Sequence, residues 1–195
     1  QSSGGSATFD AVREAPITLV ESGPVGGVIG AAELGRLIGV ENLITLDIGG
    51  TTAKTSLIAD GTINVTTEYK LEWTQLTAGY PVKVPVVDIV EIGAGGGSIA
   101  RIDDTGALRV GPESAGAEPG PAAYNQGGTE PTVTDANLLV GRYDPEHFLG
   151  GRMKLDLNRA RDAFRPIADQ LGISPEQAAL GTLRLVNSNM MNALK

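Results

Sequence analysis

The sequence contains no cysteine and a single histidine, His147, among 195 residues. Disulfide bonds, thiolate metal sites and a cysteine nucleophile are therefore excluded within this chain. A zinc site built on paired histidines has no support either. The lack of cysteine is compatible with a reducing compartment, and we expect a cytoplasmic protein. No run of about 18 apolar residues occurs, so no membrane-spanning helix is expected.

Basic residues are fewer than acidic residues. Fifteen Lys and Arg residues stand against 23 Asp and Glu, which gives a formal net charge of −8. This balance argues against nucleic acid or an anionic membrane surface as the main partner. An anionic nucleotide remains compatible, because backbone N–H groups and a bound metal ion can receive phosphate without net basic charge.

Glycine is what the sequence has in excess, with 27 of 195 residues, about twice the usual share of ~7%. The glycines are not periodic, which excludes a collagen-like chain. They cluster at 23–39, 49–50, 93–97 and 116–128. Such clusters indicate specific loops and close backbone packing, and the glycines at 26, 27 and 30 predict that their helix lies closely on a sheet or another backbone.

Both strand and helix patterns occur along the chain, and we expect a fold of the α/β class. We expect strands at 17–20, 43–48, 54–59, 62–70, 86–92, 98–103 and 107–110, and helices at 25–38, 134–140, 157–171 and from 175 to the end. Two helix starts are well marked, because Asp156 and Ser174 are good capping residues and Pro175 suits a first helical position. Pro166 should kink or shorten the helix that contains it.

The best local signal for chemistry is the string LDIGGTTAKT at 46–55. A strand delivers Asp47 into a tight turn, and a second strand leaves with Lys54. Magnesium prefers oxygen ligands and keeps much of its hydration, so Asp47 can hold Mg²⁺ through water. Lys54 is placed to face either phosphates or a neighbouring carboxylate.

The turn itself suits an anion. Gly49 and Gly50 let backbone N–H groups face a phosphate oxygen without a Cβ in the way. The hydroxyls of Thr51 and Thr52 can donate hydrogen bonds to the same oxygens. A plain β-hairpin with a Gly-Gly turn fits the same residues, so the hypothesis is a phosphate loop and the alternative is a structural turn.

Other nucleotide motifs fail. No string has the spacing of a P-loop. Residues 93–98 begin like a dinucleotide fingerprint, but Ser98 stands where a third small residue belongs, and no helix follows. Gly95, Gly96, Gly97 and Ser98 could still cradle a substrate or phosphate, or else mark a bend where two backbones pack closely.

Several strings together resemble a known family. Residues 21–31 (ESGPVGGVIGA) followed by 44–52 (ITLDIGGTT) resemble the middle of the actin/hexokinase/heat-shock-chaperone ATPase superfamily. Within it, the chain resembles the hydantoinase A family, which includes 5-oxoprolinase and the acetone carboxylase β subunit. The matching strings lie at 1–5, 22–27, 92–99, 111–121 and 127–137, in the family's order.

The resemblance implies a ribonuclease H-like fold, in which a mixed sheet with packed helices carries a β-rich insertion that is rich in Gly and Pro. Residues 1–61 would hold the connecting helix and phosphate loop, 62–131 the insertion, and 132–195 a helical segment. The family's first phosphate loop and its adenosine-side glycine string have no counterpart in this sequence. We therefore expect a fragment of a longer protein that binds ATP poorly and is inactive alone.

For the parent enzyme, the resemblance implies ATP- and Mg²⁺-dependent hydrolysis of a cyclic amide such as hydantoin, N-methylhydantoin or 5-oxoproline. The amide oxygen would be phosphorylated, and water would then open the ring with phosphate as leaving group. A partner subunit or domain resembling hydantoinase B is implied. Alternatives are the β subunit of an acetone or acetophenone carboxylase, a lobe that has lost catalysis and, from another class, an actin-like structural protein with a nucleotide switch.

Three further carboxylates are candidates for the site. Glu21 matches the glutamate that leads the connecting helix in actin-like ATPases, where it orients water or metal; a plain polar residue before a helix is the alternative. Asp88 precedes the 93–98 loop, but strand alternation places it on the opposite face from Glu91. Asp135 lies at an expected helix start, where capping is expected and substrate contact is the alternative.

Overall fold

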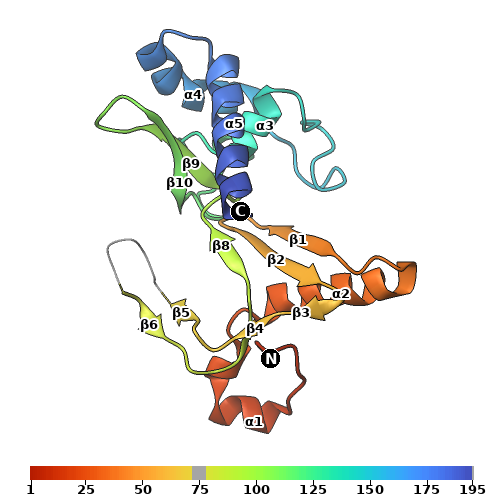
Figure 1. Ribbon diagram of the computed structural model, residues 1–195. Coiled ribbons are helices and arrows are strands. Elements are labelled where there is room, and N and C mark those ends of the chain that lie inside the picture. Colours follow the sequence, from red (N-terminus) through yellow and green to blue (C-terminus); the bar gives the residue numbers. More distant parts are fainter. Residues whose placement is uncertain (72–77, 195) are drawn as a thin grey trace. The chain divides into compact units, whose positions relative to one another are not determined.

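The computed structural model describes residues 1–71 and 78–194, and the chain forms two compact units (Figure 1). The first unit comprises Gln1–Asp47 and Lys54–Val90, and the second comprises Ile48–Ala53 and Glu91–Lys195. The units are therefore interleaved in sequence, because the short segment Ile48–Ala53 leaves the first unit and packs with the second. The segments 1–61, 62–131 and 132–195 that the resemblance implies stay a prediction.

The secondary structure confirms a mixed α/β chain. Its helices are α1 (Phe9–Glu14), η1 (Pro16–Leu19), α2 (Ser22–Ile38), η2 (Ala122–Tyr124), α3 (Val133–Leu139), α4 (Leu157–Leu171) and α5 (Pro175–Ala193). Its strands are β1 (Leu43–Ile48), β2 (Ala53–Ala59), β3 (Thr62–Ile63), β4 (Val65–Thr66), β5 (Lys70–Leu71), β6 (Tyr80–Pro81), β7 (Val86–Val87), β8 (Val90–Ile92), β9 (Ser98–Ile102) and β10 (Leu108–Ser114). No helix in the described ranges is long and apolar enough to cross a membrane.

The first unit is built on the sheet β1-β2-β3 (Figure 1). Val25 and Val28 of α2 are buried in a cluster with Ile58 of β2 and Val87 of β7. These valines are three residues apart, so they lie on one face of the helix. That apolar stripe fixes α2 to the sheet and so positions the residues at its N-terminus.

The glycines at 26, 27 and 30 of α2 do not make the close contacts that the sequence predicted. A Cβ added at Gly26, Gly27 or Gly30 would meet no neighbouring atom within 4 Å in the described chain. The close approach occurs instead at Gly35, where a Cβ would lie 2.5 Å from the Val40 carbonyl oxygen. The helix does lie on the sheet, through Val25 and Val28, but Gly26, Gly27 and Gly30 do not form the close contact.

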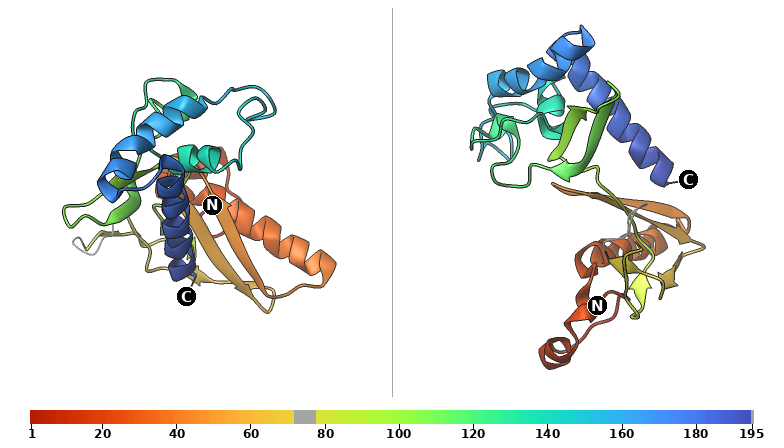
Figure 2. Two further views of the ribbon diagram at one scale, coloured as in Figure 1. Left: turned by 90° about the horizontal axis from the view of Figure 1, so that it is seen from above. Right: turned by 90° about the vertical axis from the view of Figure 1, so that its left-hand side faces the viewer.

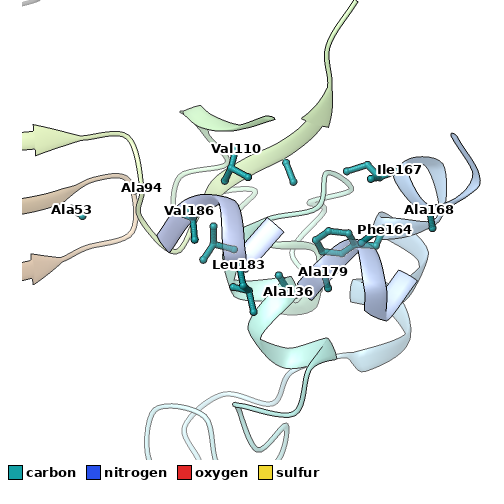
Figure 3. Close-up of a cluster of buried hydrophobic side chains, with 13 residues drawn as sticks. Ala53, Ala94, Val110, Ala136, Phe164, Ile167, Ala168, Ala179, Leu183 and Val186 are labelled. Atoms are coloured by element: carbon teal, nitrogen blue, oxygen red, sulfur yellow. The ribbon is translucent and has the colours of Figure 1, made fainter. Parts of the chain in front are cut away.

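The second unit packs three helices around a small apolar core, shown in Figure 3. Phe164 of α4 is fully buried there with Ala136 of α3 and Ala179 and Leu183 of α5. The β9–β10 hairpin lies beside α5 in the right-hand view of Figure 2, and Val110 joins the same core. The many alanines allow the helices to approach closely.

One sequence prediction about local structure is wrong, and a shortened helix at Pro166 is not observed. The expected strand at 17–20 is the 3₁₀ helix η1, which begins at Pro16 and is closed by the Thr18 hydroxyl donating to the Ala15 carbonyl. The helix α4 continues through Pro166 to its left-handed cap at Gly172. Pro166 is exposed, so the carbonyl that loses its N–H donor can be hydrated, while Phe164 and Ile167 hold the inner face.

The core predicts a clear mutational contrast. Phe164→Ala should lower the free energy of unfolding by about 3–5 kcal/mol, because it removes a fully buried ring and leaves a cavity. Phe9→Ala is the matched control, because Phe9 is 91% exposed and should cost under about 0.5 kcal/mol. Urea denaturation followed by circular dichroism measures both, and equal losses would contradict the assignment of Phe164 to the core.

Candidate functional site

Glu21 stands at the N-terminus of α2 in an unusual conformation. Its backbone is left-handed, with φ of 58°, and its side chain does not cap the helix. Left-handed backbone costs a residue with a Cβ roughly 1–2 kcal/mol. Strained backbone persists only where the surrounding structure imposes it, and such residues cluster at functional sites. Glu21 is therefore a candidate functional residue.

Two side chains hold the carboxylate of Glu21. The Tyr69 hydroxyl donates to Oε1 at 3.1 Å, and Lys54 Nζ lies 3.8 Å from Oε2. The side chains of Glu21 and Lys54 are only 15% and 16% exposed, so this ion pair is poorly screened by solvent. Of the two partners that the sequence allowed for Lys54, the neighbouring carboxylate is the one observed.

A pocket of about 200 Å³ lies within the first unit between α2 and strands β1 and β2. It is lined by Pro24, Gly27, Val28, Ala31, Thr45, Leu46, Asp47, Lys54, Thr55 and Ile89. Most of this lining is apolar or small, and the charged members are Asp47 and Lys54. The structure therefore brings these two predicted site residues to one small cavity.

The predicted phosphate loop, residues 49–52, is a tight turn closed by the Gly49 N–H donating to the Thr52 carbonyl at 2.9 Å. The N–H groups of Gly50 and Thr51 donate to no other residue in the described parts of the chain. Both residues are exposed. The turn thus presents two adjacent amide donors that the fold itself does not use.

A second glycine loop, residues 93–98, holds this turn from one side. Three consecutive N–H groups of the second loop donate to three carbonyls of the first. They run from Gly95 to Thr51, from Gly96 to Gly49 and from Gly97 to Gly50, with N···O distances of 3.2, 3.0 and 2.5 Å.

This pairing fixes the direction of the unused donors. In a trans peptide the C=O and N–H point in opposite directions. The Gly49 and Gly50 carbonyls face the second loop, so the N–H groups of Gly50 and Thr51 face away from it. The turn is therefore arranged like an anion-binding nest, with its amides outward and its carbonyls tied down.

The amides of Gly95, Gly96 and Gly97 are consumed by these hydrogen bonds, so close backbone packing is the interpretation that the geometry favours for this loop. A Cβ at Gly95 would lie 2.5 Å from the Thr51 nitrogen, and one at Gly97 would lie 2.9 Å from the Gly50 oxygen. Here glycine is required sterically.

Gly49 and Gly50 differ from these three glycines. Neither has a positive φ, and a Cβ at Gly50 would meet nothing within 4 Å. At Gly49 the nearest neighbour would be the Thr52 carbonyl oxygen at 3.7 Å, an ordinary contact. The described chain thus gives no internal reason for glycine at these positions.

Asp88 and Asp135 have structural partners instead. Asp88 accepts a hydrogen bond from the Asn64 side-chain amide at 3.0 Å. Asp135 is fully buried, and its carboxylate accepts from the N–H groups of Ala122, Ala123 and Thr132 and from the Thr132 hydroxyl. Burial raises the pKa of Asp135, while these donors oppose the rise. The helix cap is Thr132, and Asp135 completes a capping box.

The sequence did not indicate Tyr69 as a partner of Glu21 or Thr134 as a support for the second glycine loop. The Thr134 N–H donates to the Gly96 carbonyl at 2.8 Å. Neither contact has a signal in the sequence, because 48 residues separate Tyr69 from Glu21 and 38 separate Thr134 from Gly96. Such pairs become visible only in the folded chain.

A metal ion would have few protein ligands here. Within residues 1–71 and 78–194 no group of three or more His, Asp or Glu side chains could hold one. Mg²⁺ nevertheless fits a single exposed carboxylate such as Asp47, because it keeps several waters and takes phosphate oxygens from its substrate. The sole histidine pairs with Asp144 at 2.9 Å on an exposed loop.

Comparison with known proteins identifies similar chains. A sequence model of the family described as hydantoinase/oxoprolinase matches residues 1–195. The caprolactamase subunit alpha of Pseudomonas jessenii is 41% identical over 196 residues, which cover 100% of this chain and 27% of that protein. The 5-oxoprolinase of Saccharomyces cerevisiae is 36% identical over 209 residues, covering 100% and 15%.

A solved structure agrees with these matches. Nucleotide-free acetone carboxylase, described under the mechanism of ATP-dependent acetone carboxylation, has a TM-score of 0.86 at 36% identity and covers 99% of this chain and 26% of its own. The chain spans between 26% and 29% of the first curated relatives it matches.

The buried cap gives a testable prediction. Asp135→Ala should lower the free energy of unfolding by about 1.5–3 kcal/mol, because four buried donors lose a charged acceptor. Asp104→Ala, at an exposed hairpin turn, is the control and should change stability by under about 0.5 kcal/mol. Urea denaturation compares the stability of the two variants. An unchanged midpoint for Asp135→Ala would contradict its structural role.

Proposed function

Because the chain belongs to the hydantoinase/oxoprolinase family, we propose that it is part of an ATP-dependent enzyme that hydrolyses a cyclic amide such as hydantoin, N-methylhydantoin or 5-oxoproline. The observation that carries this proposal is the turn at 49–52, with two outward amides that no described residue uses. Relatives named as caprolactamase and 5-oxoprolinase support the substrate class. We further propose that the fold is of the ribonuclease H-like type.

The chemistry explains why ATP is needed. An amide resists attack by water at neutral pH, and transfer of the γ-phosphoryl group to its oxygen creates a good leaving group. Water then attacks the ring carbon and the C–N bond opens, which leaves an acyl phosphate. A second water attacks the acyl carbon, phosphate leaves, and the ring-opened acid is released. Phosphoryl transfer depends mainly on positioning and charge stabilisation, which the N–H groups of Gly50 and Thr51 and the hydroxyls of Thr51 and Thr52 would supply.

Charged residues complete the proposed roles. Asp47 lies two residues before Gly49 in the sequence and would hold Mg²⁺ through water; the bound ion would neutralise phosphate charge. Glu21 would orient water or metal-bound water, with Lys54 and Tyr69 keeping its carboxylate in place.

The second half of the reaction would require more protein than this chain. One relative is named as an alpha subunit, and we propose a partner subunit or fused domain resembling hydantoinase B. The segment alone is then expected to bind ATP poorly.

Ketone carboxylation is the second candidate, favoured by the TM-score of 0.86 against acetone carboxylase. It would use the same activation, with phosphorylation of an oxygen atom before the carbon–carbon bond forms. The turn and its support would keep their roles, and only the substrate would differ.

The test is phosphate release by the full-length polypeptide with its partner, with and without each cyclic amide. Asp47→Ala should abolish stimulation, and Gly50→Ala should lower kcat/KM for ATP by about 10²-fold, because a Cβ would stand where phosphate approaches the amides. Gly30→Ala is the control, since a Cβ there also meets nothing within 4 Å.

The outcomes separate the candidates. Stimulation by a cyclic amide that Asp47→Ala removes would support the hydrolase. Stimulation only by bicarbonate with acetone or acetophenone would favour the carboxylase. Full activity in Gly50→Ala would exclude the turn from phosphate binding.

A further inference from the structure

We propose that Ser98, together with the amides of residues 95–97, is a positioning element that aims the phosphate loop and thereby gives the enzyme its selectivity for the phosphate tail of a nucleotide. This inference rests on the proposed function, because it assigns a role to residues behind the turn at 49–52. It requires no contact between Ser98 and the nucleotide.

Ser98 occupies the first position of β9 and is fully buried. Its hydroxyl accepts a hydrogen bond from the Gly95 N–H at 3.0 Å and donates to the Thr51 carbonyl at 3.4 Å. The Gly95 N–H also points to that carbonyl, at 3.2 Å. One side chain thus closes the second loop and anchors the first loop at the same time.

The hydrogen bonds to the Gly49, Gly50 and Thr51 carbonyls determine how the turn presents its N–H groups to a ligand. Each held carbonyl fixes the plane of its peptide and so the direction of the next N–H. The peptides that carry the Gly50 and Thr51 N–H groups are held by Gly96 and Gly97. The next peptide is held by Gly95 and Ser98, so Thr51 is fixed on both sides and its N–H cannot turn away. An anion nest requires successive amides to converge, so loss of one anchor should weaken phosphate binding without removing a donor.

The second loop is itself firmly supported, which lets it act as a fixed reference. The Thr134 N–H donates to the Gly96 carbonyl at 2.8 Å, and the Ala115 N–H donates to the Gly97 carbonyl at 2.9 Å. Ser114 pairs with Ser98 across the β9–β10 ladder and donates from its hydroxyl to Thr51 Oγ1 at 3.4 Å.

Selectivity for phosphate distinguishes positioning from general structural support. If Ser98 positions the turn, its loss should weaken the binding of ligands whose phosphate groups contact the turn. A ligand that lacks phosphate should bind unchanged. A general loss of folding would weaken every ligand alike.

The experiment measures equilibrium binding of ATP and of adenosine to the full-length enzyme with its partner, by isothermal titration calorimetry. Ser98→Ala removes one hydroxyl. It should raise the dissociation constant for ATP by about three- to tenfold, because one anchoring hydrogen bond is lost. Adenosine should bind within about twofold of the wild type, and Gly95→Ala should show a larger loss for ATP.

Ser2→Ala is a matched control. Ser2 is also buried, and its hydroxyl donates to a backbone carbonyl, that of Thr18, at 2.7 Å. It belongs to the first unit, away from the glycine loops in sequence. Ser2→Ala should cost similar stability in a thermal melt and leave the ratio of ATP to adenosine affinity unchanged.

The dissociation constants for ATP and adenosine decide whether Ser98 is a positioning residue. A raised ratio of the ATP and adenosine dissociation constants in Ser98→Ala supports the inference. Equal weakening of both ligands, or no change in either, overturns it. If Gly50→Ala weakens ATP while Ser98→Ala does not, only the positioning role fails; if neither variant affects ATP, the proposed phosphate loop fails with it.

Discussion

The hydrogen bonds between the two glycine loops are the interaction on which the candidate site depends. Three amides of residues 95–97 bind three carbonyls of residues 49–51 directly. Such an approach is possible only without Cβ atoms on the supporting loop. One set of contacts therefore both packs the turn and decides which way its remaining amides point.

The surrounding structure supplies a rigid base for that interaction. The supporting loop leads into β9, and β9 pairs with β10. Val110 of β10 and Ala136 of α3 belong to the core around Phe164. Asp135 joins the start of α3 to the backbone of η2. The apolar core and the buried carboxylate thus act on the site through the backbone, and they hold the loop in place without facing a ligand.

Much of this could be predicted from the sequence, and the failures have physical causes. The boundaries of β1, the caps at Asp156 and Ser174 and the turn at 49–52 follow from local patterns, which depend on near neighbours in the chain. The role of Gly95 and the pairing of Tyr69 with Glu21 depend on distant segments, for which spacing carries no information. The helix α4 is not shortened at Pro166, because that side of the helix faces solvent, which the sequence does not show.

The contrast between the two glycine loops separates two kinds of selective pressure. At Gly95 and Gly97 any larger residue would collide with the backbone of the turn, so these positions are constrained by folding itself. At Gly50 the protein alone would accept alanine. A library of random replacements sorted only for soluble expression should therefore keep diversity at position 50 and lose it at 95 and 97. Sorting the same library for growth on the natural substrate would remove the diversity at 50 as well.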